Sequence, residues 1–133
     1  DGFVEEEILH AVSEKINQIE YDLPLLLIHH SVLGTDECPL KNSARMIDFI
    51  REHNIKNVFC GHTHELELMR TTDLYHGNTF TQFMCGTLSS CNHANDDNMF
   101  LYYKNLGSDN MHLYLVRIFP EEGKMHFKEE RVF

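Results

Sequence analysis

The chain has 133 residues, of which 42% are hydrophobic and 24% charged, which is ordinary for one globular domain spanning residues 1–133. Its formal net charge of -10 argues against non-specific nucleic-acid binding and against an anionic membrane surface as partner, because both attract basic proteins. The longest apolar run in the sequence is far too short to cross a bilayer. A bound metal can still attract a phosphorylated substrate to an acidic protein.

The first half of the chain predicts a leading helix followed by a strand–helix–strand unit. Apolar residues recur at helical spacing over residues 4–19, and glutamates begin that run, where they suit the helix dipole. Residues 25–28 are continuously apolar, which is typical of a buried parallel strand. A second helix is predicted from Ser43, as its N-cap, to His53, and a second apolar strand at residues 58–60. Two strands joined in this way are expected to be parallel.

The second half predicts antiparallel strands, at residues 65–70, 79–84, 111–119 and 124–132. The last two are joined by Pro120-Glu121-Glu122-Gly123, which predicts a hairpin turn. Between them and the earlier strands, residues 86–110 are rich in Asn, Ser and Asp and are predicted to form a long loop. An aromatic patch at residues 100–103 is expected to be satellite core. A polar surface position is expected for His93, Asp96 and Asp97.

The cysteines indicate a reducing compartment. Cys38, Cys60, Cys85 and Cys91 form neither a CxxC pair nor a dense framework. In a chain of this size, such cysteines are typical of reduced thiols in a cytosolic protein. We therefore expect a cytoplasmic location.

Histidines follow both strands of the predicted parallel pair. His29 and His30 come directly after Ile28, and His62 and His64 come just after Cys60. The carboxyl ends of parallel strands meet at one edge of a sheet, where ligands gather in α/β folds. We therefore expect both histidine pairs to lie on the same rim.

The spacing of the second pair suggests two metal ions. Gly61 permits a tight turn that would fan His62 and His64 apart. Imidazoles placed in this way can serve two metals about 3.5–4 Å apart, the separation used in two-metal hydrolysis. Neutral imidazole suits Zn, Fe or Ni, and Mn becomes possible where carboxylates share the site. The spacing is therefore compatible with a centre for two divalent metal ions.

The stretch Val58-Phe59-Cys60-Gly61-His62-Thr63-His64, with Leu25-Leu26-Leu27-Ile28-His29-His30 upstream across one helix, resembles the calcineurin-like metallophosphoesterase superfamily. That family ends one core strand with a histidine, often in His-His-Pro, and the next with Gly-His-x-His. The resemblance covers most of the chain but only the last two metal motifs. It implies an α/β fold, the C-terminal half of an α-β-β-α sandwich, in which one βαβ unit precedes antiparallel strands and a terminal hairpin.

The resemblance also implies roles for four histidines. His29 and His62 would bind the second metal, and His64 would bind the first. His30 would line the substrate side or donate a hydrogen bond to a ligand, and it is the residue expected to assist catalysis. The implied reaction is hydrolysis of a phosphomonoester or phosphodiester, within a phosphorylated small molecule, by a hydroxide that the two metals activate.

The chain departs from the family in two ways. Ser31 and Val32 stand where proline is frequent. The earlier motifs Asp-x-His, Gly-Asp-x-x-Asp and Gly-Asn-His/Asp-Glu would precede residue 1, and they supply the bridging Asp and most ligands of the first metal. We therefore expect this chain alone to bind metal weakly and to have little or no hydrolytic activity. Half a sheet would also leave an open edge, which predicts self-association.

Other roles for these residues stay open at the level of sequence. The chain can be a non-catalytic module that binds a partner or a single metal. A structural zinc site can be drawn from Cys60, His62 and His64, with Cys85 or Cys91 as the fourth ligand. For each histidine, the plain alternative is a strand-end or turn residue without a metal.

Overall fold

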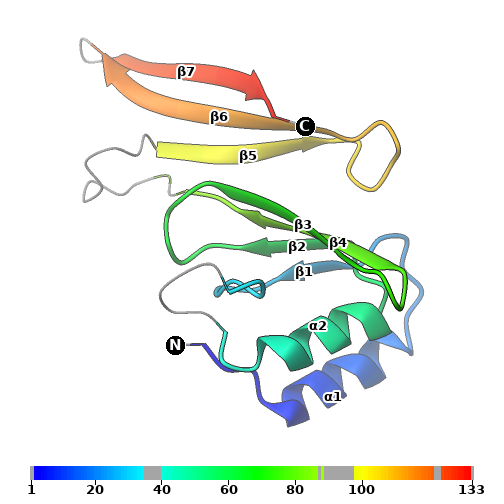
Figure 1. The fold of residues 1–133 in the computed structure, drawn as a ribbon. Helices are drawn as coiled ribbons and strands as arrows, with labels where there is room; N and C mark the ends of the chain where they lie inside the picture. Colours follow the sequence, from blue (N-terminus) through cyan, green and yellow to red (C-terminus); the bar gives the residue numbers. More distant parts are fainter. Residues whose placement is uncertain (1, 35–39, 87, 89–97, 122–123, 133) are drawn as a thin grey trace. The chain divides into compact units, whose positions relative to one another are not determined.

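The computed structural model describes residues 2–34, 40–86, 88, 98–121 and 124–132. The elements are α1 (Glu6–Ile16), β1 (Leu25–Leu27), α2 (Ser43–Glu52), β2 (Asn57–Cys60), β3 (Glu67–Asp73), β4 (Asn78–Met84), β5 (Asn98–Lys104), β6 (His112–Glu121) and β7 (Lys124–Arg131) (Figure 1). This mixed content agrees with the predicted α/β class.

The chain divides into two compact units. The first consists of residues 1–63 and 67–84, and the second of residues 64–66 and 85–133. One domain over the whole chain stays a prediction, and each unit is described by itself below. Among the described residues, neither helix has the length and apolar character needed to cross a membrane.

The first unit is built on a four-stranded sheet with the order β1-β2-β4-β3. β1 and β2 are parallel, with Leu27 opposite Phe59, which confirms the predicted strand–helix–strand unit. The prediction of only antiparallel strands after residue 64 is wrong for β4, which is parallel to β2 and antiparallel to β3. The β3–β4 hairpin reverses the chain and returns β4 in the direction of β2.

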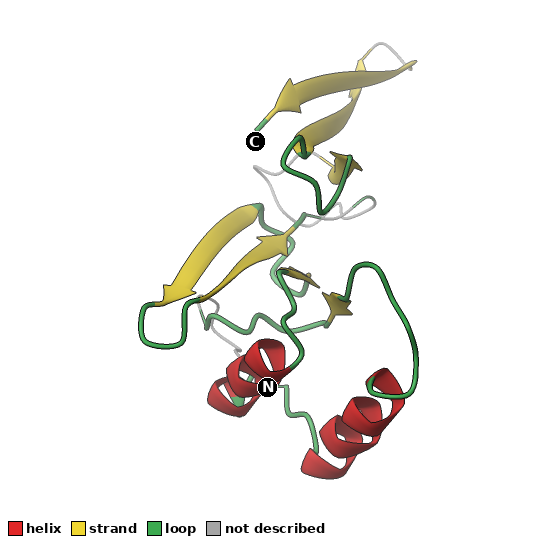
Figure 2. Ribbon diagram, turned by 90° about the vertical axis from the view of Figure 1, so that its right-hand side faces the viewer, coloured by secondary structure: helices red, strands yellow, loops and turns green. Residues whose placement is uncertain are grey.

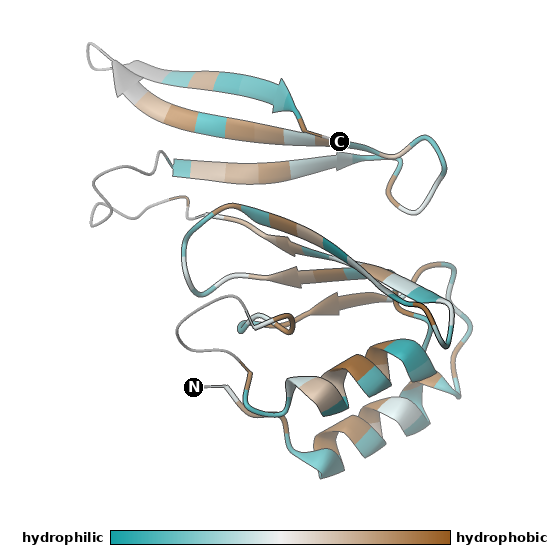
Figure 3. Cartoon of the chain, in the orientation of Figure 1, coloured by the Kyte–Doolittle hydropathy of each residue, from teal (hydrophilic) through white to brown (hydrophobic). Residues whose placement is uncertain are grey.

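Both helices pack on the same face of this sheet (Figure 2). Apolar and polar residues alternate along both helices (Figure 3). Leu9 of α1 is buried in the core, whereas Ile8 and Val12 of the same helix are 53% and 42% exposed. The shared core consists of Leu9, Val32, Leu40, Met46, Phe49, Ile50, Ile55, Val58 and Phe80. This core holds α2 against the sheet, while direct pairing of β1 and β2 brings their carboxyl ends side by side.

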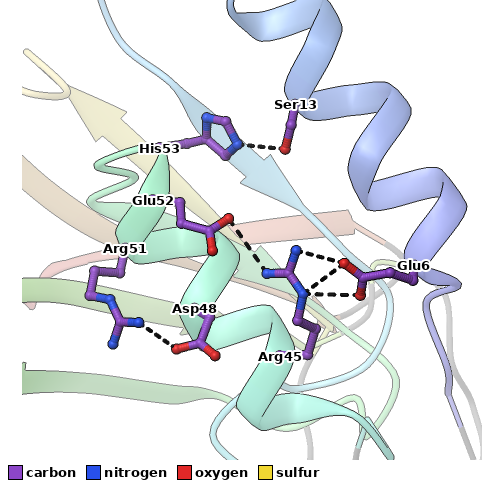
Figure 4. A network of polar contacts seen from close by, with 7 residues as sticks. All are labelled: Glu6, Ser13, Arg45, Asp48, Arg51, Glu52 and His53. Carbon is purple, nitrogen blue, oxygen red and sulfur yellow. Dashed lines mark hydrogen bonds and ion pairs between the residues drawn. The ribbon is translucent and has the colours of Figure 1, made fainter.

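Polar contacts join the two helices at their exposed sides (Figure 4). Arg45 of α2 donates to both carboxylate oxygens of Glu6 at 2.8–3.0 Å, and its Nη1 lies 3.5 Å from a carboxylate oxygen of Glu52. The hydrogen bond from Arg45 lowers the pKa of Glu6. Near the other end of α2, the Ser13 hydroxyl lies 2.7 Å from Nε2 of His53. These contacts hold α1 and α2 in one arrangement.

The start of α2 differs from the prediction. Asn42, and not Ser43, occupies the N-cap position, and its side chain makes no capping hydrogen bond. Its Oδ1 instead accepts a hydrogen bond from the Val4 amide at 3.2 Å, and its Nδ2 donates to the Val4 carbonyl at 2.6 Å. The Lys41 amide donates to the Gly2 carbonyl at 2.8 Å. The first residues of the chain are therefore tied to the segment that leads into α2.

β1 is more exposed than the sequence predicts. Its residues Leu25 and Leu27 are 41% and 75% exposed, whereas Leu26 packs against the core. β1 is an edge strand in the described sheet, and alternate side chains of a strand point to opposite faces. Leu25 and Leu27 thus occupy the face without helices. Self-association through this edge stays a prediction.

The second unit contains an antiparallel sheet with the order β5-β6-β7. β6 and β7 confirm the two predicted C-terminal strands and their hairpin pairing. β5 lies inside the segment predicted as a loop, so that prediction is wrong for residues 98–104. Met99 of β5 is buried while Phe100 and Tyr102 are exposed, because alternate side chains of a strand point to opposite faces of the sheet. The described residues do not include the remaining candidates of that segment, which are Cys91, His93, Asp96 and Asp97. Cys38 also lies outside the described residues.

Candidate functional site

The ends of β1 and β2 bring histidines from distant parts of the sequence together. Ile28 donates its amide hydrogen to the Phe59 carbonyl at 2.9 Å, which continues the parallel ladder past β1. One step further, the Gly61 amide donates to the His29 carbonyl at 3.1 Å. The backbone at His29 is therefore fixed directly beside the turn that carries His62.

Three imidazoles form one cluster at this rim. Nε2 of His29 lies 3.1 Å from Nδ1 of His62. The ring centroids lie 4.9 Å apart for His29 and His30, 5.0 Å for His29 and His62, and 4.6 Å for His30 and His62. One ring nitrogen of each residue lies within 4.8 Å of the others. His29 is exposed and the other two are half-buried, so the cluster is open to solvent on one side.

His62 stands in a strained turn. The Thr63 amide donates to the Gly61 carbonyl at 3.1 Å, which closes a γ-turn around His62, and His62 has φ of 80°. A γ-turn with positive φ at its centre is rare and costly for a residue with a Cβ. The expectation that Gly61 supplies the turn is wrong, because Gly61 is not among the residues with positive φ. The histidine itself takes the unfavourable backbone conformation.

Replacing His62 by glycine should therefore leave a more stable protein than replacing it by alanine. Alanine keeps the Cβ at positive φ, whereas glycine adopts this conformation without a steric cost. We expect the free energy of unfolding of His62→Gly to exceed that of His62→Ala by about 1 kcal/mol, after allowing for the extra chain entropy of glycine. Urea denaturation of both variants measures the difference. Equal stability, or a more stable His62→Ala, would contradict the strained turn.

The ring of His30 packs against the backbone of Gly2. A Cβ at position 2 would lie 2.5 Å from Nδ1 and 2.6 Å from Cγ of His30, which no side chain tolerates. Gly2 is buried and forms a bridge with Leu40. The sequence did not suggest this contact, because Gly2 lies far from His30 in the chain and carries no motif.

A buried glutamine holds the loop that follows His30. Gln82 of β4 is fully buried, and its Oε1 accepts hydrogen bonds from the amides of Val32 at 2.8 Å and Leu33 at 3.1 Å. Ser31 is also fully buried, and its hydroxyl accepts from the Gly34 amide at 3.1 Å. The sequence analysis missed Gln82. Its signal was a lone amide between Phe80 and Met84 on the buried face of an apolar strand.

The three clustered histidines are a group that could hold a metal ion. A scan against protein-family models and a search of curated proteins found no match to this chain. What the cluster can do therefore follows from its own donors. Neutral imidazole nitrogens bind Zn, Ni, Cu and Fe well. Ligand nitrogens of a tetrahedral zinc ion lie about 3.3 Å apart at bond lengths of 2.0–2.1 Å, which is close to the 3.1 Å between Nε2 of His29 and Nδ1 of His62.

Two other predicted ligands have different positions. His64 belongs to the second unit, has φ of 64°, and is not one of the three clustered residues. Its role as a ligand of the first metal stays a prediction. Cys60, a member of the alternative zinc site, is half-buried, and its thiol lies 3.8 Å from the Phe83 carbonyl, to which it donates. Cys60 is not part of the described cluster either.

Proposed function

We propose that this chain carries the metal-binding part of a metal-dependent phosphoesterase. The observation that supports this proposal is the cluster of His29, His30 and His62 at the carboxyl ends of two parallel strands. Ligand sites of α/β sheets occupy such rims. The Gly-His-x-His sequence after β2 and its resemblance to calcineurin-like metallophosphoesterases give the site its reaction class. The fold proposed with it is the C-terminal half of an α-β-β-α sandwich.

In this proposal the chain provides ligands for two divalent ions, drawn from Mn, Fe, Zn and Ni. His29 and His62 hold one ion, His64 contributes to the other, and His30 faces the substrate. Bound metal would activate water and hold the oxygens of a phosphomonoester or phosphodiester. The protein's own part is to fix the backbone of the two ligands through the ladder hydrogen bond at His29 and the γ-turn at His62. Both contacts hold the main chain from which the rings project toward the proposed ion.

The proposed activity of this chain alone is weak. The cluster contains imidazoles and no carboxylate, so its donors do not offset the charge of two divalent ions. Phosphoester hydrolysis by two metals relies on a closely spaced pair of ions, which a shared anionic ligand stabilises. A complete site needs such groups from elsewhere.

The test is hydrolysis of bis(p-nitrophenyl) phosphate with added Mn²⁺ or Zn²⁺. We expect slow, metal-dependent turnover, far below the roughly 1–10³ s⁻¹ of ordinary enzymes. It should disappear with a chelator and in His62→Ala. His10→Ala is the matched control, because His10 is an exposed histidine on α1. Equal rates for the unmodified chain and His62→Ala would contradict the proposal, and an ordinary enzymatic rate would contradict the incomplete site.

A non-catalytic metal- or partner-binding module is the second candidate. Among the residues that the structure describes, the cluster contains imidazoles without a carboxylate. This favours the second candidate, because three neutral ligands can hold an ion without completing a hydrolytic centre. Metal binding that depends on His62, without any metal-dependent hydrolysis, would support this candidate over the enzyme.

A further inference from the structure

The arrangement of the three ring nitrogens suits one bound ion better than two. All lie within 4.8 Å of one another, and the closest pair is separated by 3.1 Å. One ion with bonds of about 2.0–2.1 Å needs ligand nitrogens about 3.3 Å apart, so small side-chain movements are enough for the third ring. Two ions shared among three imidazoles would leave each ion with at most two protein ligands from this cluster.

We infer that His29, His30 and His62 form a site for one borderline-soft divalent cation, such as Zn²⁺ or Co²⁺, with His30 as a direct ligand. This inference rests on the metal-binding part of the proposed function and changes it in two respects. The cluster takes one ion, and His30 binds that ion where the proposed function turns it toward the substrate.

The chemistry of the donors selects the class of ion. Three neutral nitrogens favour Zn²⁺, Co²⁺, Ni²⁺ or Cu²⁺ over Mg²⁺ and Ca²⁺, which prefer oxygen ligands. Three protein ligands also leave the fourth position of a tetrahedral ion open. His29 is exposed, so this position is accessible from solvent for water or for an anionic oxygen ligand.

Each ligand is held by a different backbone contact. The carbonyl of His29 accepts from the Gly61 amide, and the γ-turn fixes the backbone at His62. The His30 ring packs on Gly2, and the loop after it is held by the buried amide of Gln82. These contacts fix the backbone that carries the three rings, so less conformational freedom is lost when an ion binds.

The test is a titration of the whole chain with Co²⁺, followed by its visible absorption spectrum. We expect one Co²⁺ per chain, with the intense d–d bands of a four- or five-coordinate ion, and competition by Zn²⁺. His29→Ala, His30→Ala and His62→Ala should each weaken Co²⁺ binding by at least about 100-fold, more than is usual for the loss of a residue behind a ligand. His30→Gln keeps most of the side-chain volume and should show the same loss.

Two matched variants complete the experiment. His10→Ala removes an exposed histidine and should bind Co²⁺ like the unmodified chain. His64→Ala should also keep one Co²⁺ with an unchanged spectrum. Far-ultraviolet circular dichroism checks that each variant is folded.

The outcomes separate this inference from the proposed function. Binding of two Co²⁺, or binding that needs His64 and survives both His30 variants, would overturn the inference and leave the proposed function intact. One Co²⁺ that depends on His30, without any metal-dependent hydrolysis, would uphold the inference while the enzyme proposal fails. A folded chain that binds neither Co²⁺ nor Zn²⁺ would overturn both.

Discussion

Replacing Gln82 by leucine is expected to lower the free energy of unfolding by about 2–4 kcal/mol, because each unsatisfied buried amide costs about 1–3 kcal/mol. The side chain is fully buried, and its Oε1 accepts from the amides of Val32 and Leu33. Leucine has nearly the same size but no acceptor, so the buried amide of Val32 and the part-buried amide of Leu33 would both lose their partner. Urea denaturation measures the change.

The same substitution should weaken metal binding. Val32 and Leu33 come after His30 and Ser31, and this segment loses its anchor on β4 when the amide of Gln82 is removed. We expect the affinity for Co²⁺ to fall by at least about ten-fold, as for other groups that orient a ligand.

Gln18→Leu is the matched control for this effect, because Gln18 is exposed after the end of α1. Its stability should change by less than about 0.5 kcal/mol. A Gln82→Leu protein with the stability and Co²⁺ affinity of the unmodified chain would contradict the role given to Gln82. A similar loss in Gln18→Leu would show that the leucine, and not the lost acceptor, is responsible.

The rim of the site was predictable from local patterns. The apolar runs around Leu26 and Val58 are separated by an amphipathic stretch, and the structure confirms that they form parallel neighbours. Parallel strands place their carboxyl ends together, so His29 and His62 meet for a reason that the sequence already contains. The fold class and the C-terminal hairpin follow from the same periodicities.

The other parts of the site depend on contacts that no local pattern records. Gly2 meets His30 only because the start of the chain is tied to Lys41 and Asn42. The neighbours of a strand are likewise set at long range, which is why the parallel pairing of β4 was missed. β5 was assigned to the loop because its neighbours in the sequence are rich in Asn, Ser and Asp, although residues 99–103 of the strand are apolar or aromatic.

The turn in Gly61-His62-Thr63-His64 was wrongly predicted to depend on Gly61, and the reason is physical. Glycine is the usual residue at positive φ, so a turn next to a glycine is normally assigned to it. In the structure, His62 and His64 have the positive φ values, 80° and 64°. Strain of this kind persists where the surrounding contacts determine the conformation, and it is frequent at functional sites.

Replacing Gly2 by alanine should affect the site, whereas replacing Gly61 by alanine should not. The new Cβ would lie 2.5 Å from Nδ1 of His30, so the imidazole has to leave its place in the cluster. We expect a loss of about 1–3 kcal/mol in the free energy of unfolding, as for other overpacked sites. If His30 is a metal ligand, the affinity for Co²⁺ should fall together with stability.

Gly61→Ala is the matched control, because a Cβ at position 61 would meet nothing within 4 Å. We expect its stability to change by less than about 0.5 kcal/mol and its Co²⁺ binding to stay the same. Unchanged Co²⁺ binding in Gly2→Ala would mean that the ring of His30 is not needed where the structure places it. A loss of Co²⁺ binding in Gly61→Ala, without a loss in Gly2→Ala, would instead mean that the turn and the site depend on Gly61.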